Sequence, residues 1–150
     1  MEQYNAYSFL LERTARRIKQ YAQYQFNYRQ FGITVDQWTI LKSLRQHADL
    51  PQKELAECCG KDQPTLTRIV DLLVSKELVE RRANPTDRRS YVVHLTAAGE
   101  QKIDELTTYI NEIRMQAWKN LDDSDFQHLK RILDTIYSNL EINENTRNSN

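Results

Sequence analysis

Residues 62–96 constrain the fold most, because an amphipathic helix is followed directly by a basic β-hairpin. Apolar side chains recur along one side of the helix at helical spacing, at Leu66, Ile69, Val70, Leu73 and Val74. Two short strands follow, joined by turn residues at 84–87, and they carry four arginines, at Arg81, Arg82, Arg88 and Arg89. A helix that fits a major groove, beside a hairpin that reaches a neighbouring groove, predicts a surface that reads duplex DNA.

The residues ahead of this helix complete a helix-turn-helix pattern. Pro51 suits the first turn of a helix, and Gly60 suits its C-terminal end. Asp62 can cap the next helix, with Pro64 tolerated in the first turn. The spacing therefore predicts two helices joined by a short, glycine-containing turn.

Long helices are predicted on both sides of this unit, because the 150 residues include only three glycines and three prolines. A first helix is expected over about residues 3–29. Thr34 and Gln37 form a capping box, which opens a helix that ends near His47. The apolar residues that this helix is expected to bury are Val35, Trp38, Ile40, Leu41 and Leu44.

The C-terminal part of the chain predicts one strand pair and two more helices. Leu78 and Val79 are expected to begin the first strand. Thr96 can cap a helix that runs to about Lys119, and residues 121–124 form a break with a cap. The last helix carries an apolar stripe at Phe126, Leu129, Ile132, Leu133, Ile136 and Leu140.

Charge is unevenly distributed along a chain whose formal net charge is zero. Residues 61–90 hold seven Lys and Arg against five Asp and Glu, a net +2, whereas residues 91–150 hold six against ten, a net −4. A local basic patch is enough to bind DNA. The apolar content of 39% is low for a self-contained globule, which suits a protein that completes its core by pairing with a second copy.

Several other classes of protein are not indicated. The chain has no nucleophile elbow, phosphate-binding glycine loop or paired catalytic motif, so no enzymatic activity is predicted. The histidines at 47, 94 and 128 lie in separate elements without metal-ligand spacing, so neither a metal nor another cofactor is expected. The sequence has no apolar run of about 20 residues and no signal pattern at its start, so we expect a cytoplasmic protein.

Cys58 and Cys59 are adjacent, which excludes a disulfide framework because neighbouring cysteines close almost no loop. A thiol-based redox sensor remains an alternative, since a reactive cysteine needs exposure and a lowered pKa. Cys59 falls on the apolar side of its helix and is expected to be a buried structural thiol. Cys58 is expected to be the more exposed of the pair.

Two motifs carry a family resemblance: Asp87-Arg88-Arg89 in the hairpin and Leu95-Thr96-Ala97-Ala98-Gly99 after it. They resemble the Asp-x-Arg and Leu-Thr-x-x-Gly signatures of the MarR family of bacterial transcription regulators. Residues 66–73 look like the recognition helix of that family, and residues 53–57 look like the helix before it. The resemblance implies a winged helix-turn-helix homodimer on a pseudo-palindromic operator. It also implies a repressor that is released by a small, often phenolic, ligand or by an oxidant.

The expected fold is therefore mainly α with a small β-hairpin wing. We expect a winged helix-turn-helix lobe over residues 33–99, and a helical dimerisation region over residues 1–32 and 100–142. Residues 143–150 are expected to form a disordered tail. Glu77 stands where family members usually have glycine, and a left-handed non-glycine residue costs about 1–2 kcal/mol, so we expect this helix end to differ. The first helix lacks the cysteine on which the thiol switch of one branch depends.

Candidate DNA contacts follow from the resemblance and from side-chain chemistry. In the recognition helix they are Gln63, Thr65, Thr67 and Arg68, which would meet bases or phosphates. In the wing, Arg89 would enter the minor groove, Asp87 would orient it through a charge-assisted bond, and Arg88 would contact phosphate. Further candidate phosphate contacts are Lys61, Arg81 and Arg82, although one of the last two is expected to bond within the protein.

A small aromatic effector would bind between the dimer helices and the DNA-binding lobe. Its candidate aromatic walls are Tyr21, Tyr24, Phe26 and Trp38. Two alternatives to the ligand-released regulator stay open. One is a winged-helix module that binds protein instead of DNA, and the other is a redox-sensing regulator that acts through Cys58 and Cys59.

Overall fold

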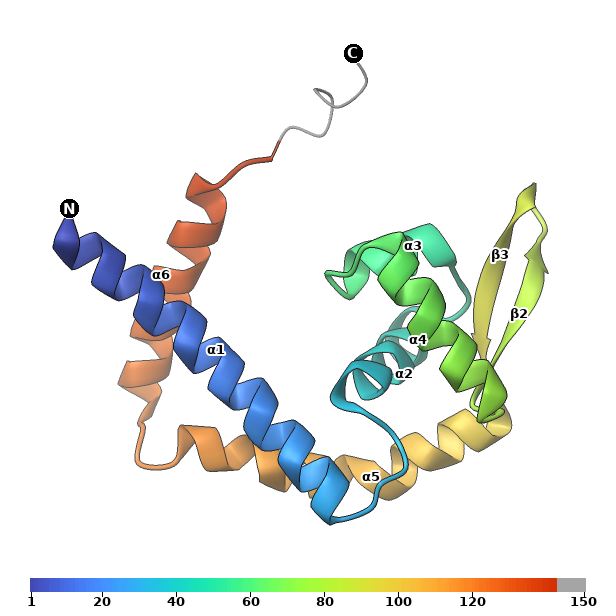
Figure 1. Cartoon of the computed structure of the whole chain (residues 1–150), viewed down its shortest axis with the longest axis horizontal. Coiled ribbons are helices and arrows are strands. Elements are labelled where there is room, and N and C mark those ends of the chain that lie inside the picture. The colour runs from blue at the N-terminus through green and yellow to red at the C-terminus, as the bar shows by residue number, and fades with distance from the viewer. Residues whose placement is uncertain (143–150) are drawn as a thin grey trace. The chain divides into compact units, whose positions relative to one another are not determined.

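The computed structural model describes residues 1–142. The chain divides into two compact units, Met1–Arg114 and the residues from Met115 onward. The elements of the first unit, drawn in Figure 1, are α1 (Glu2–Tyr28), α2 (Val35–His47), β1 (Leu50–Pro51), α3 (Gln52–Cys58), α4 (Gln63–Ser75), β2 (Val79–Asn84), β3 (Asp87–Leu95) and α5 (Ala97–Met115) up to Arg114. The second unit holds a 3-10 helix (Gln116–Trp118) and α6 (Asp123–Asn139). The expected disordered tail, residues 143–150, lies outside the described residues.

The predicted cap of α2 is confirmed in full. The Thr34 hydroxyl oxygen accepts from the backbone N–H of Gln37, and the Gln37 side-chain oxygen accepts from the backbone N–H of Thr34, both at 3.1 Å. The helix ends at His47, as expected. This cap fixes where the chain turns from α1 into the helix-turn-helix lobe.

A three-stranded antiparallel sheet, in the order β1-β3-β2, replaces the simple hairpin that the sequence suggests. The added strand is β1, in which Leu50 pairs with Val93 and Pro51 with Val92. We expected Pro51 only at the start of a helix, and it does stand immediately before α3. A strand of two residues is too short to show any alternation, so sequence periodicity could not reveal it.

The core of the first unit lies beneath α4, where Leu66, Val70 and Leu73 are fully buried. Buried residues from the neighbouring helices and strands pack into the same cluster, among them Trp38, Leu41, Leu44, Leu55, Val93, Ile103 and Ile110. Burial of one face of α4 leaves the opposite face in solvent. Val74, which we expected on the buried face, is instead exposed.

We expected the non-glycine residue at position 77 to change the end of α4. The helix end instead keeps the usual left-handed turn. Glu77 adopts the left-handed conformation with φ +59°, so the chain makes the turn that glycine usually makes. The Glu77 N–H donates to the Val74 carbonyl at 2.9 Å, and the Leu78 N–H donates to the Leu73 carbonyl at 3.1 Å. These bonds close the helix with Leu78 as part of its end. The first wing strand therefore begins at Val79, not at Leu78.

Replacement of Glu77 by glycine is expected to raise the free energy of unfolding by about 1 kcal/mol, because glycine has no Cβ to strain the left-handed conformation. Urea unfolding at one fixed protein concentration measures this change as a higher midpoint with an unchanged m-value. Glu105→Gly is the matched control, because Glu105 is exposed in the middle of α5. The control should lose about 1 kcal/mol. Equal losses in the two variants would contradict the prediction.

α5 is shorter than the sequence predicts, and α6 begins at a capping box. We expected the helix after the wing to reach Lys119, but α5 ends at Met115 and a 3-10 helix follows. Asn120 then takes a positive φ of 66°, which turns the chain. Asp122 and Asp125 form a capping box that opens α6, with both bonds at 3.0 Å.

Candidate nucleic-acid interface

The N-terminal turn of α4 is held by its cap, which confirms the predicted role of Asp62. The Asp62 carboxylate accepts from the Thr65 backbone N–H at 2.8 Å and from the Thr65 hydroxyl at 3.0 Å. The backbone bond, followed by the hydroxyl bond, lowers the pKa of Asp62. The Thr65 hydroxyl therefore already donates its hydrogen to Asp62. The nearby Gln63 side chain is exposed.

Thr67 is held by α3 as well as by its own helix. Its hydroxyl donates to the Gln63 carbonyl at 2.9 Å and accepts from the Gln52 side-chain amide at 2.7 Å. Gln52 is the first residue of α3, and our sequence analysis did not select it. No local pattern marks it, because its partner lies 15 residues away. Because the hydroxyl already makes two hydrogen bonds, Thr67 can contact a ligand only through its methyl group and one remaining lone pair. Arg68 is exposed and makes no ion pair within residues 1–142.

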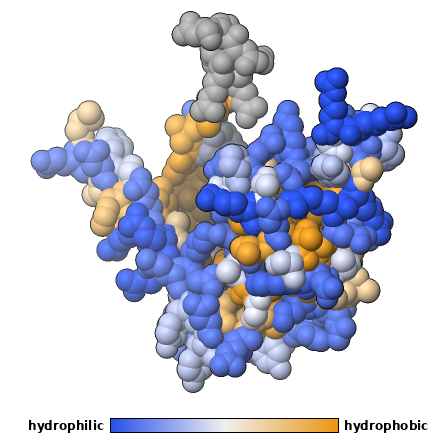
Figure 2. Space-filling model, turned by 45° about the vertical axis from the view of Figure 1, so that its right-hand side comes forward, coloured by the Kyte–Doolittle hydropathy of each residue, from blue (hydrophilic) through white to orange (hydrophobic). Residues whose placement is uncertain are grey.

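The wing turn is built by Asn84. Its side-chain oxygen accepts from the Thr86 backbone N–H at 3.1 Å and from the Thr86 hydroxyl at 2.9 Å, and its amide donates to Ser90 at 2.9 Å. Pro85 and Thr86 form the tip between β2 and β3. The tip region is exposed, and Figure 2 shows strongly hydrophilic side chains projecting at this end of the molecule.

Asp87 acts on the backbone of the wing and not on a guanidinium. Its carboxylate accepts from the backbone N–H of Arg89 at 3.0 Å. We expected a charge-assisted bond from Asp87 to the Arg89 side chain, and no such ion pair is present within residues 1–142. Asp87 therefore holds the backbone of β3 at Arg89 and forms no bond to the guanidinium of Arg89.

The four wing arginines fall into two pairs. Arg81 bonds to Asp71 of α4 at 2.6 Å and to the Thr67 carbonyl at 3.4 Å, which ties the wing to α4 beside it (Figure 1). Arg82 bonds to Glu80 at 2.5 Å. Arg88 and Arg89 are exposed and form no ion pair in the part of the chain that the structure describes. We expected one of Arg81 and Arg82 to bond within the protein, and both do. Arg88 and Arg89 are the two cationic side chains left beside the wing tip.

Lys61, at the turn before α4, is engaged by an acidic residue of α2. Its ammonium donates to Asp36 at 2.9 Å, and Lys19 of α1 reaches the same carboxylate oxygen at 2.9 Å. Burial acts to raise the pKa of Asp36, but the hydrogen bonds and charges of Lys19 and Lys61 outweigh it, so this pKa lies below its ordinary value. Lys61 is therefore a structural link between α1, α2 and the turn, and a phosphate would have to compete with Asp36 for it.

The two cysteines differ as expected in exposure: Cys58 is exposed and Cys59 is half-buried. The Cys59 thiol donates to the Ser43 hydroxyl at 3.5 Å. Burial raises the pKa of Cys59, although the bond to Ser43 opposes this. A raised pKa keeps the thiol protonated and is the opposite of what a reactive cysteine needs.

The aromatic residues that we selected as effector-cleft walls do not form one surface. Trp38 and Phe26 are each only 2% exposed and lie in the hydrophobic core, which is what the helical spacing of Trp38 also predicted. Tyr21 and Tyr24 are exposed on α1. Within residues 1–142 there is no group of three or more His, Cys, Asp or Glu placed to hold a metal ion. No helix among those residues has the length and apolarity that a bilayer crossing requires.

Two helices joined by a short turn, with a two-stranded hairpin fixed to the second, define this chain as a winged helix-turn-helix protein. Residues 33–91 match the model of the MarR family. Over its helix-turn-helix and most of its wing, the chain is thus similar to the MarR family of transcription regulators.

A curated relative and two solved structures illustrate the similarity. The chain is 27% identical over 106 residues to the HTH-type transcriptional regulator YhbI of Bacillus subtilis, an alignment that covers 71% of this chain and 69% of YhbI. It resembles a single-residue mutant of MarR from E. coli, solved with operator DNA, at 27% identity and a TM-score of 0.79, over 86% of this chain and 91% of that one. It also resembles MepR from S. aureus, solved with DNA, at 26% identity and a TM-score of 0.80, over 89% of this chain and 98% of that one.

Proposed function

We propose that this DNA-binding transcription regulator is a homodimeric repressor that binds a pseudo-palindromic operator and is released by a small ligand. The observation that carries the DNA-binding role is that an exposed α4 face adjoins a wing with two arginines that form no ion pair within residues 1–142. Gln63 and Arg68 are exposed on α4, and Arg88 and Arg89 are exposed on β3. The relatives MarR and MepR, whose structures contain DNA, have the same fold.

The proposed contacts divide by groove. Arg68 and Gln63 suit the base edges of the major groove, since Arg pairs with guanine and Gln with adenine. Thr67 presents its methyl group, which suits the methyl of thymine. Arg89 is assigned to the minor groove and Arg88 to a phosphate.

The homodimer is supported by apolar side chains that one chain leaves exposed. On α1 these are Phe9, Leu10, Leu11 and Ile18, and on α6 and its C-cap they are Phe126, Ile132, Leu133, Ile136 and Leu140. Large exposed apolar side chains that cluster on a helix are typical of an interaction surface. A second copy of the chain is the partner that would cover both helices by symmetry.

Selection from a random pool of duplexes should recover a two-fold symmetric site that binds two chains. The logarithm of its affinity should fall steeply with the logarithm of salt concentration, because phosphate neutralisation releases counterions. Sedimentation equilibrium in the absence of DNA should give a dimer at micromolar concentration. If the chain ignored every duplex even in dilute buffer and in the absence of ligand, it would instead be the winged-helix protein-interaction module.

A further inference from the structure

Thr67 lies at a point where α3, α4 and the wing meet. Its hydroxyl donates to the Gln63 carbonyl, one turn earlier in α4, and accepts from the side-chain amide of Gln52 on α3 at 2.7 Å. Its own carbonyl accepts from Arg81 of β2 at 3.4 Å. Thr67 and Gln52 are both half-buried, whereas Gln63 and Arg68 are exposed. Within residues 1–142, Thr67 is the one candidate DNA contact of α4 whose side chain is held from another helix.

The hydrogen bond from Gln52 selects between two arrangements of the Thr67 side chain. A threonine in a helix divides between two rotamers, because its hydroxyl can bond to a carbonyl of the preceding turn. That carbonyl takes the only hydrogen of the Thr67 hydroxyl, so a partner on α3 has to be a donor, as the Gln52 amide is. The bond from Gln52 therefore favours the rotamer in which the hydroxyl is directed at α3. The methyl group is the branch of the side chain that is left without a hydrogen bond.

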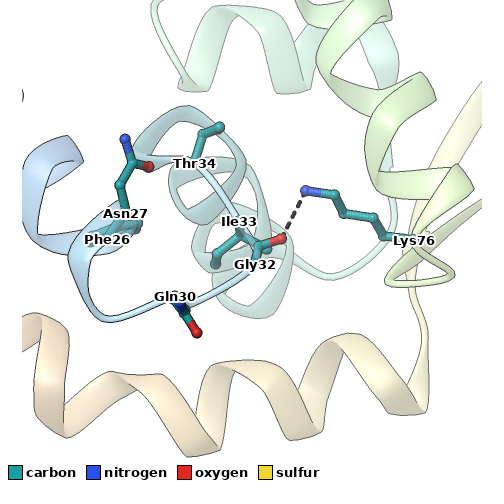
Figure 3. A pocket seen from close by; sticks show the side chains of 7 residues that line it. All are labelled: Phe26, Asn27, Gln30, Gly32, Ile33, Thr34 and Lys76. Atoms are coloured by element: carbon teal, nitrogen blue, oxygen red, sulfur yellow. Dashed lines mark hydrogen bonds between the residues drawn. The ribbon is translucent and has the colours of Figure 1, made fainter.

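Contacts that do not involve Gln52 hold α4 in place. Asp62 caps its first turn, and the apolar face of the helix is buried in the core. At its other end the C-cap residue, Lys76, donates to the Gly32 carbonyl at 2.8 Å, the bond drawn in Figure 3. Loss of the Gln52 amide should therefore change the rotamer of Thr67 and leave the helix where it is.

We propose that Gln52 is a positioning residue that makes Thr67 specific for thymine. Gln52 holds the hydroxyl away from the bases, so that the Thr67 methyl group packs on the 5-methyl group of one thymine in each half-site. A threonine hydroxyl that is free to turn hydrogen-bonds to several bases, so the preference for thymine is lost without Gln52. This inference rests on the proposed function, because it requires α4 to lie in a major groove.

Operators in which single thymines are replaced by deoxyuridine test the preference, because the replacement removes the 5-methyl group and keeps every hydrogen-bonding group of the base. For the wild type, the replacement at one position of a half-site should weaken binding about fourfold, the contribution of one buried methyl group. Gln52→Met keeps the length of the side chain but has no N–H donor. This variant should bind the thymine and deoxyuridine operators almost equally well.

Thr67→Val provides the rescue that separates positioning from stability. Valine has two methyl groups on Cβ and no hydroxyl for Gln52 to hold. Thr67→Val should therefore discriminate against deoxyuridine with either Gln or Met at position 52, whereas general damage to the lobe by Gln52→Met would not be repaired in this way. The matched control is Gln101→Ala, which removes a glutamine that bonds within α5, to Glu105 at 2.9 Å. This control should discriminate as the wild type does.

NMR coupling constants of the Thr67 methyl carbon measure the rotamer in the free protein. They should report one rotamer in the wild type and an average of two in Gln52→Met. Unchanged couplings in Gln52→Met would overturn the positioning by Gln52. Thymine reading would be overturned if the wild type showed no deoxyuridine penalty, or if Gln52→Met kept the full penalty. A chain that bound no duplex would contradict the proposed function and the thymine preference with it, while the couplings would still decide whether Gln52 holds Thr67.

Discussion

Gly99→Ala is expected to lower the free energy of unfolding by about 2–4 kcal/mol, because the new methyl group has no space. A Cβ on Gly99 would stand 2.2 Å from the carbonyl oxygen of Leu78 and 2.6 Å from Cδ1 of Leu95. The first of these atoms is backbone, so it cannot swing aside as the end of a side chain can. The better helix propensity of alanine, about 1 kcal/mol, offsets only part of this cost.

Neighbouring hydrogen bonds connect Gly99 to the end of α4. The Thr96 hydroxyl oxygen accepts from the Gly99 N–H at 3.0 Å, and the hydroxyl donates to the Glu77 carbonyl at 2.7 Å. The first turn of α5 is thereby fixed against the end of α4, with no room for a side chain between them. The clash should therefore disturb the end of α4 as well as the overall stability.

Urea unfolding at one fixed concentration measures the loss, because the stability of a dimer depends on protomer concentration. Ala98→Gly is the matched control, since Ala98 is exposed in the same turn of α5. The control should lose about 1 kcal/mol or less. If Gly99→Ala were as stable as the wild type, the close approach of α5 to Leu78 would be wrong.

The parts of the fold that the sequence predicts are those decided by neighbours along the chain. The capping box of Thr34 and Gln37 is confirmed because both of its bonds join residues three positions apart. The cap of Asp62 on Thr65 is local in the same way. The apolar stripe of α4 predicts its buried face because a helix has a fixed period, and Leu66, Val70 and Leu73 are indeed buried.

The parts that the sequence does not predict depend on partners far along the chain. Glu77 keeps the left-handed turn despite its own preference, because Thr96 holds its carbonyl from 19 residues away. A local rule for helix ends was wrong there because tertiary contacts override it. Sequence predicted that one of Arg81 and Arg82 would bond within the protein, but both do. The partner of Arg81 could not be predicted, because Asp71 lies opposite it only after the wing packs on α4.

Arg89→Ala is expected to weaken operator binding by about 2–4 kcal/mol, roughly 30-fold to 1,000-fold, because the proposed dimer presents two wings. Each wing loses a guanidinium assigned to the minor groove, at about 1–2 kcal/mol per arginine. Arg89 has no acidic partner within residues 1–142, so its removal breaks no ion pair inside the protein. Because its backbone N–H still bonds to Asp87, the wing should keep its shape. Fluorescence anisotropy of the labelled operator at several salt concentrations measures both affinity and salt slope, and the slope should fall by about two charges per dimer.

Two further variants test whether Arg89 binds DNA through its charge alone. They are Arg82→Ala, which removes a charge elsewhere on the hairpin, and Arg89→Lys, which keeps the charge at position 89. Arg82 carries the same charge on the same hairpin but is bonded to Glu80, so its loss should cost much less affinity than the loss of Arg89. Lysine at position 89 keeps the charge and therefore most of the salt slope, but it lacks the planar guanidinium and should recover only part of the affinity. Equal losses in Arg82→Ala and Arg89→Ala would show that the hairpin acts through net charge alone. Unchanged affinity in Arg89→Ala would remove the wing from the DNA interface and leave α4 to bind alone.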